Sequence, residues 1–291
     1  MARMTIGAAF SETFAFLKAN WLQMLMWFGA ALVLLGLLGY LMLGSTFTAM
    51  AMSPGDPSAF LSAFGKIGLF ALIAAVVLYA ACMLIWRGGL YPGEAPNFGW
   101  ALQAGPAFAF GMFVVMIAAY VMILIVMLVF GLLFGAAIGG MSGFSPESFD
   151  SGAVGGGAMF VMVLLYLAFI LFLLWVQGRF IVAGPVMADR LTRNPVTGLG
   201  ESWKLTQSSQ WVIVGFYVLF AILTFVYMMI AGMIFGAILG GFASGGSAAG
   251  AMISMILMAV LIYLPLLMAS FSMPVGIYRA IAPRVSADIF T

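Results

Sequence analysis

The sequence predicts an all-α, polytopic membrane protein with six transmembrane helices. Hydrophobic residues make up 66% of the 291 residues, and charged residues make up only 6%. A soluble domain averages about 45–50% apolar and about 25% charged residues. The apolar residues also occur in long continuous runs, whereas the strands of a membrane β-barrel alternate in polarity over about 10 residues. These observations exclude a soluble protein and a membrane β-barrel.

Six apolar runs are long enough to cross the hydrocarbon layer of a bilayer, which takes about 20 residues. The expected spans are residues 21–43, 67–86, 107–139, 158–178, 211–240 and 250–278. No span has Asp, Glu, Lys or Arg in its central part. The segments between them are too short for a soluble domain, so residues 1–291 are expected to form a single membrane domain. Glu12 and Lys18 precede the first run, which favours an uncleaved first span over a signal peptide.

The positively charged residues predict the orientation of the spans. One side of the expected topology carries Arg3, Lys18, Arg87, Arg179, Arg190, Arg193, Lys204, Arg279 and Arg284, and the other side carries only Lys66. Cytoplasmic loops of membrane proteins are enriched in Lys and Arg. We therefore expect a multi-pass protein of a bacterial inner membrane with both termini in the cytoplasm.

Two segments on the cation-rich side are expected to form short amphipathic helices. Residues 5–20 and 195–206 precede the first and fifth spans, and Asn194 and Pro195 are typical of an N-cap and a first-turn proline. Apolar residues recur on one face of each segment: Ile6, Phe10, Phe14 and Leu17 in the first, and Val196, Leu199 and Trp203 in the second. We expect this face to lie in the headgroup region. The segments then either fix where the spans enter the bilayer or form a docking surface.

Spans three and five end in the same glycine pattern, 101 residues apart. The pattern comprises Gly131, Gly135 and Gly139 in span three and Gly232, Gly236 and Gly240 in span five. Even-numbered spans also end alike, with an aromatic residue beside an arginine. We therefore expect three helical hairpins of the same orientation. Glycines four residues apart let two helix backbones approach closely in lipid, so the stripes are expected either to pack span three on span five or to form a homodimer seam.

Local irregularities are expected in two places. Residues 97–106 carry little charge, so the middle hairpin is expected to be the least regular of the three. Pro265 and Pro274 predict kinks in the last span, because each proline removes a backbone hydrogen bond from a helix. Spans three and five are longer than the hydrocarbon layer and must tilt, break or extend beyond it.

The residue inventory excludes most catalytic and cofactor chemistry. The chain has no histidine and one cysteine, Cys82, so it lacks a Ser-His-Asp site, a Cys-His site, a His-ligated metal site and a thiolate cluster. The net charge of +2 is too small for a nucleic-acid-binding protein. We therefore expect no enzymatic activity, no cofactor, no metal and no nucleic-acid partner.

The candidate site residues are cations at the membrane surface. They are Arg87, Arg179, Arg190, Arg193, Lys204 and Arg279, and we expect them to contact lipid headgroups or a partner protein. Arg179 follows about 20 apolar residues, the length of one span. If that span begins later than expected, Arg179 lies deeper and becomes a specific contact for lipid phosphate or a partner.

Several short stretches resemble those of YciC-like bacterial membrane proteins. They are Ile6-Gly-Ala-Ala-Phe-Ser-Glu-Thr-Phe14, Leu17-Lys-Ala-Asn-Trp21, Gly178-Arg-Phe180 through Pro185, Gly198-Leu-Gly-Glu-Ser-Trp-Lys-Leu-Thr206 with Trp211, and Tyr278-Arg279. That group is similar to the membrane domain attached to some glycerophosphodiester phosphodiesterases. The resemblance implies a six-helix inner-membrane protein without a settled biochemical role. It implies no catalytic residue, because the phosphodiesterases act through a separate soluble domain.

Three functions fit the sequence. The first is a non-enzymatic scaffold or accessory subunit whose partners are membrane lipids and another membrane protein or a second copy of the chain. The second is a carrier or exporter of an apolar or amphipathic solute, with a lumen lined by Met, Phe and Tyr. The third is a lipid-modifying enzyme that depends on Arg179 or Glu201. We expect the scaffold role.

Overall fold

The computed structural model describes all residues except 1–3, 53–56, 140–155, 245–253, 255–256 and 283–291. The described elements are the helices α1 (Ile6–Met52), α2 (Pro57–Leu90), α3 (Phe98–Gly139), α5 (Gly156–Phe180), α6 (Ala183–Asp189), α7 (Pro195–Thr206), α8 (Gln210–Ser244), a π-helical turn η1 (Ala259–Tyr263) and α10 (Leu264–Ile281). Six of these helices are long and apolar enough to cross a membrane. The predicted all-α class with six candidate spans is therefore confirmed.

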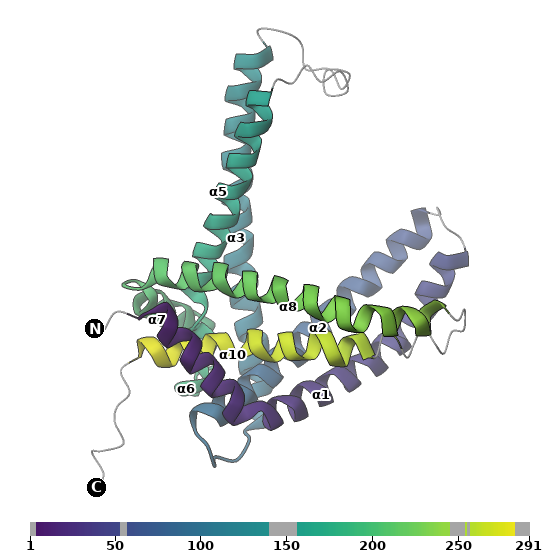
Figure 1. Ribbon diagram of the computed structural model, residues 1–291, viewed down its shortest axis with the longest axis vertical. Coiled ribbons are helices and arrows are strands. Elements are labelled where there is room, and N and C mark those ends of the chain that lie inside the picture. The colour runs from purple at the N-terminus through teal and green to yellow at the C-terminus, as the bar shows by residue number, and fades with distance from the viewer. Residues whose placement is uncertain (1–3, 53–56, 140–155, 245–253, 255–256, 283–291) are drawn as a thin grey trace.

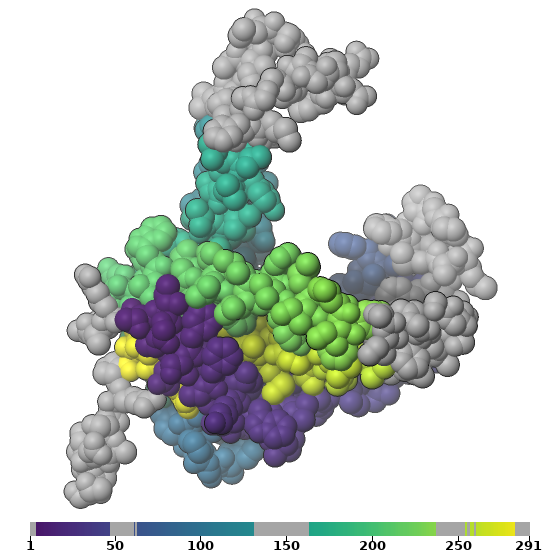
Figure 2. Space-filling view, viewed as in Figure 1, coloured from purple at the N-terminus to yellow at the C-terminus, as the bar shows by residue number. Residues whose placement is uncertain are grey.

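The long helices form three hairpins that meet at one end of the molecule. These hairpins are α1 with α2, α3 with α5, and α8 with α10, and the short helices α6 and α7 lie where they meet (Figure 1). Helix α1 packs along α2 and along α10, so the first and third hairpins lie together. The α3–α5 hairpin points away from the other two, and Figure 2 shows it standing apart from the packed surfaces of α1, α8 and α10.

The end where the hairpins meet carries most of the described positive charge, and we call it the cation-rich end. It comprises the last turns of α2, α5 and α10, the residues 91–97, and helices α6 and α7. The largest buried cluster among the described residues includes Trp86 and Met187 of this end, together with Phe16 of α1 and Trp100 of α3. Farther along α3 and α8 most large apolar side chains are exposed, as expected of helices whose solvent is lipid.

The N-terminal segment differs from the prediction, because residues 5–20 are not a separate surface helix. Helix α1 continues without interruption from Ile6 to Met52. Its first turns bury Ala9, Thr13 and Phe16 against the protein, whereas Phe14 is 55% exposed. Thr13 lies against Gly276 of α10, where a Cβ atom would meet the Thr13 backbone at 2.6 Å. The small side chains of Thr13 and Gly276 allow α1 and α10 to approach closely. The apolar face expected for residues 5–20 did not predict this contact.

Residues 98–106 are also more regular than expected. Helix α3 begins at Phe98, and the Asn97 side chain caps it by accepting a hydrogen bond from the Trp100 amide at 2.9 Å. The helix continues through Pro106. Gly105 lies against the α2 backbone, since a Cβ there would be 2.6 Å from the Ala80 nitrogen. The middle hairpin therefore starts with a capped helix that packs on α2.

The start of helix α7 is as predicted. The Asn194 side chain accepts a hydrogen bond from the Val196 amide at 3.0 Å, and Pro195 occupies the first turn of α7. The expected disturbance around Pro265 coincides with the π-helical turn η1, which directly precedes the α-helical part of the span. Pro274 lies inside α10.

Candidate functional site

A partly open apolar cavity of about 960 Å³ lies between the hairpins, next to the cation-rich end. Its walls come from α2, α3, α5, α8 and α10, with Phe180 and Ile181 at the end of α5. Its volume is at the upper end of the range of about 300–1,000 Å³ that is typical of ligand pockets. The lining residues are mostly Leu, Val, Ala, Met and Phe, and none of them is charged.

Aromatic side chains fix the wall of the cavity nearest the cation-rich end. The Phe108 ring makes edge contacts with Tyr79 at a centroid distance of 5.4 Å and with Trp86 at 5.9 Å. The Trp86 indole N–H donates to the Phe271 carbonyl of α10 at 2.8 Å. Trp86 is also packed on Gly184 of α6, where a Cβ atom would collide with its ring. Four elements are therefore held together around one indole.

Four lining residues bring neutral polar groups to this apolar cavity. They are Tyr79, Gln177, Tyr217 and Ser270. Within the described part of the chain, their side chains have no hydrogen-bond partner. Two hydroxyl-bearing rings, an amide and a hydroxyl are thus available to a bound molecule. They can donate to and accept from uncharged oxygen or nitrogen atoms.

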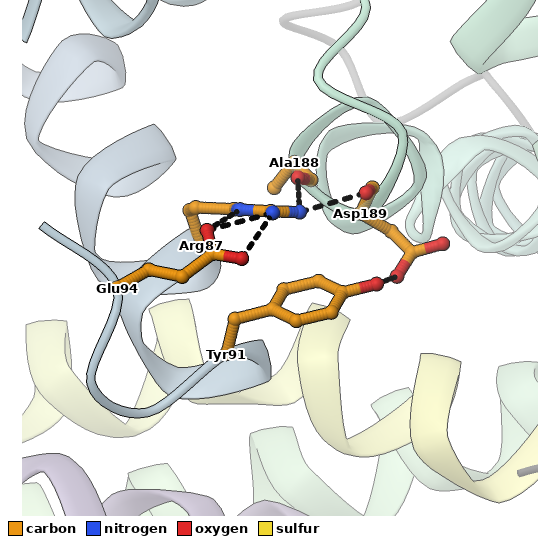
Figure 3. Close-up of polar contacts among 5 residues, drawn as sticks. All are labelled: Arg87, Tyr91, Glu94, Ala188 and Asp189. Atoms are coloured by element: carbon orange, nitrogen blue, oxygen red, sulfur yellow. Dashed lines mark hydrogen bonds and ion pairs between the residues drawn. The ribbon is translucent and has the colours of Figure 1, made fainter. Parts of the chain in front are cut away.

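Beside the cavity, Arg87 joins the end of α2 to the end of α6. Its guanidinium donates to the Ala188 and Asp189 carbonyls at 3.1 and 2.8 Å and forms a two-pronged ion pair with Glu94, as Figure 3 shows. It also lies 3.8 Å from the centre of the Tyr91 ring. A cation at the C-terminal carbonyls of a helix is favoured by the helix dipole.

The Asp189 carboxylate links two tyrosines from different helical hairpins. Tyr91 donates to one carboxylate oxygen at 2.7 Å, and Tyr278 of α10 donates to the other at 3.0 Å. The hydrogen bond to Asp189 raises the pKa of Tyr91, and burial adds to the shift. Asp189 thus holds residues 91–97, α6 and α10 in one arrangement.

The remaining predicted cations lie in different surroundings. Arg279 donates to the Gly89 carbonyl and lies 5.2 Å from the Phe16 ring centre. Arg190 and Lys204 are exposed and pair with Glu201 at 3.3 and 3.4 Å. Arg193 is exposed. Of these residues, Arg279 joins two helices, α10 and α2, inside the protein.

Arg179 is the buried exception among the predicted cations. Its side chain is 2% exposed and its guanidinium lies 3.9 Å from the centre of the Trp203 ring. Two of its nitrogens, Nε and Nη1, lack a hydrogen-bond partner among the described residues. The Arg179 carbonyl, in contrast, accepts hydrogen bonds from Ser202 at 2.8 Å and Thr206 at 3.2 Å.

The predicted glycine stripes are only partly described. A Cβ at Gly232 or Gly236 would have nothing within 4 Å, so neither glycine packs against another described helix. The side-chain surroundings of Gly131, Gly135, Gly139 and Gly240 lie outside the described residues. The described glycines in the closest helix contacts are others, at or near the cation-rich end: Gly88, Gly89, Gly105, Gly111, Gly184, Gly198 and Gly276. Their neighbours are distant in sequence, so spacing alone does not reveal them.

The described residues contain no group of three or more His, Cys, Asp or Glu side chains that could hold a metal ion. Cys82 is buried as a free thiol. Comparison with protein-family models, with curated proteins and with solved structures finds no match. The function is therefore inferred from the geometry of the cavity and of the cation-rich end.

Proposed function

We propose that this chain is a membrane protein that binds an apolar or amphipathic solute in the cavity between its hairpins and carries it within or across the bilayer. The single observation that supports the proposal is the cavity of about 960 Å³ with uncharged walls. Met112, Met116 and Met273 lie among its phenylalanines. Unbranched methionine side chains adapt to differently shaped apolar partners.

The lining also defines the class of solute. A charged group placed among these walls would lose its hydration without gaining a counter-charge, which is strongly unfavourable. A neutral hydroxyl, carbonyl or amide could instead bond to Gln177, Tyr79 or Tyr217. The proposed solute therefore has a long apolar body and an uncharged polar end.

A photolabelling experiment tests the binding. The full chain in lipid vesicles is irradiated with a long-chain fatty alcohol that carries a diazirine, and the labelled peptides are mapped. We expect saturable labelling of the cavity walls that an excess of unlabelled alcohol removes. Labelling that rises linearly and spreads evenly over lipid-facing residues would contradict the proposal.

A matched pair of variants on α3 supplies the control. Ala109 lines the cavity, whereas Ala118 of the same helix is exposed and outside the lining. Ala109→Trp fills part of the cavity and is expected to abolish saturable labelling, and Ala118→Trp is expected to leave it unchanged. Equal transfer of the alcohol between vesicles with and without the protein would remove the carrier role and leave only binding.

The second candidate is the non-enzymatic scaffold expected from the sequence. It is favoured by the cation-rich end, where Arg87, Arg279 and Trp86 join helices that are distant in the sequence. Val196 of α7 is 73% exposed on this end, beside exposed Arg193. A partner that co-purifies with the wild-type chain and is lost from Val196→Asp, with unchanged protein level, would support this role.

A further inference from the structure

Arg179 carries a positive charge that the described protein does not neutralise. Its side chain is almost completely buried, and Nε and Nη1 have no hydrogen-bond partner there. The described ion pairs place Glu94 on Arg87, and Glu201 on Arg190 and Lys204, but no carboxylate on Arg179. A buried charge without a partner is costly, and the cation–π contact with Trp203 offsets only part of that cost.

A second unpaired polar group is linked to the Arg179 backbone through one intervening residue, Thr206. The hydroxyl of Ser209, which directly precedes α8, is buried and has no partner among the described residues. Thr206 contacts the backbones of both residues. Its hydroxyl donates to the Ser202 carbonyl at 2.8 Å and shares that hydrogen with the Arg179 carbonyl at 3.2 Å, and its own carbonyl accepts from the Ser209 amide at 3.1 Å. The start of the 35-residue helix α8 adds the positive end of a helix dipole.

Two tryptophans, Trp203 and Trp175, lie beside this site, and tryptophan is typical of the membrane–water interface. The Trp203 ring is 41% exposed and covers the Arg179 guanidinium. Trp175 makes an edge contact with Trp203 at 5.7 Å and donates to the Gln210 side chain at 3.3 Å. Indole rings favour the headgroup level, where one edge is apolar and the other is hydrated.

We propose that Arg179, covered by Trp203 next to the start of α8, binds the phosphate of an anionic lipid headgroup in the leaflet on the cation-rich side. A guanidinium offers parallel N–H donors that match phosphate oxygens, and its unpaired nitrogens are the donors needed. The Trp203 ring lies over the guanidinium at 3.9 Å, so the proposed site includes this side chain. This site is separate from the uncharged cavity of the proposed function and goes beyond it.

Lipid titration of the purified full chain tests the site. Delipidated protein in neutral detergent receives phosphatidylglycerol or phosphatidylcholine, and retained lipids are counted by native mass spectrometry. We expect preferential retention of one phosphatidylglycerol molecule. Arg179→Gln should weaken this binding about tenfold, the equivalent of one charge-assisted hydrogen bond. Arg190→Gln is the matched control, because Arg190 is exposed and paired with Glu201, and it should change binding less than about twofold.

The unfolding temperatures of the same proteins, measured with and without lipid, test the site even if Arg179→Gln alters folding. Without lipid, Arg179→Gln should unfold at the same temperature as the wild type or higher, because it removes a buried unpaired charge. With phosphatidylglycerol, only the wild type and Arg190→Gln should gain stability. Saturable protection by soluble glycerol phosphate alone would support the phosphate site but assign it to a water-soluble ligand. Identical responses of wild type and Arg179→Gln to phosphatidylglycerol would overturn the proposal, whether or not the cavity binds its solute.

Discussion

At the scale of single residues, the molecule depends on a few side chains that reach between hairpins. Trp86 is the clearest case, since its ring fills the space over Gly184 and its N–H donates to the Phe271 carbonyl. In lipid, helices gain little from burying apolar surface against each other, so close packing and interhelical hydrogen bonds decide which contacts persist. A methyl group at Gly184 would therefore disturb the whole cation-rich end.

Two glycine-to-alanine substitutions test this packing. Gly184→Ala places a Cβ against the Trp86 ring and should lower stability by about 1–3 kcal/mol. Gly200→Ala, on the exposed part of α7 with nothing within 4 Å, should instead raise stability by about 0.5–1 kcal/mol. Thermal unfolding in detergent measures both. Equal effects of the two variants would show that the Trp86 contact is not close-packed.

The Tyr91–Asp189 hydrogen bond predicts a dependence of stability on pH. Because the folded-state pKa of Tyr91 is raised above its ordinary value of 10.0, the stabilisation is complete below pH 10 and is lost as the pH rises through the folded pKa. The free energy of unfolding of the wild type should exceed that of Tyr91→Phe by about 1 kcal/mol at pH 8. This difference should vanish at high pH, where Tyr91 is ionised. Chemical unfolding at pH 8 and at a series of pH values above 10 measures this difference, and a difference that stays constant throughout would contradict the assignment.

At the scale of elements, the short helices α6 and α7 position the ends of the long ones. Helix α6 has only 7 residues and follows α5 almost directly. Isolated helices of that length are unstable, so α6 depends on Trp86 over Gly184 and on Arg87 at its last carbonyls. Helix α7 in turn packs on α6 where Gly198 lies against Met187.

Replacement of Arg87 tests how α6 is held. Arg87→Gln removes donors from two carbonyls and breaks the ion pair with Glu94, and should lower stability by about 2–3 kcal/mol. Arg193→Gln, at an exposed arginine between α6 and α7, should change stability by less than about 0.5 kcal/mol. Thermal unfolding compares the two variants. A similarly small effect of both would mean that α6 is stable without the hydrogen bonds from Arg87 to its last carbonyls.

At the scale of the whole molecule, the chain exposes long apolar helices that only a lipid environment can cover. Its described cations gather where the three hairpins meet, apart from Lys66 near the start of α2. The α3–α5 hairpin diverges from the other two (Figure 1). The cavity is lined by helices of all three hairpins, apart from α1. Cavity and cation-rich end are thus adjacent parts of one arrangement of hairpins.

Labelling of single cysteines tests the orientation proposed from these charges. Cys82 is buried and is first replaced by alanine. In intact cells, an impermeant maleimide should label Lys66→Cys, and it should label Lys204→Cys only after the membrane is opened. Both positions are exposed. Labelling of Lys204→Cys in intact cells would reverse the orientation and place Arg179 in the outer leaflet.

The sequence by itself determined the all-α class, the six spans and the helix start at Asn194, because hydropathy and capping are local properties. It also singled out Arg179, because a later start of the span before it would place this charge deeper in the membrane than the other cations. Only the tertiary structure decided that Gly184, Gly105 and Gly276 make the close contacts, since their neighbours Trp86, Ala80 and Thr13 are distant in the chain.

The cavity was equally beyond the reach of sequence patterns. Its walls come from five helices whose apolar residues look alike in composition, and only the divergence of the hairpins separates those that line a space from those that face lipid. Sequence patterns also could not predict that Arg179 lacks hydrogen-bond partners among the described residues. A sequence shows that a charge is present, but its burial and its unpaired nitrogens depend on how α5, α7 and α8 meet.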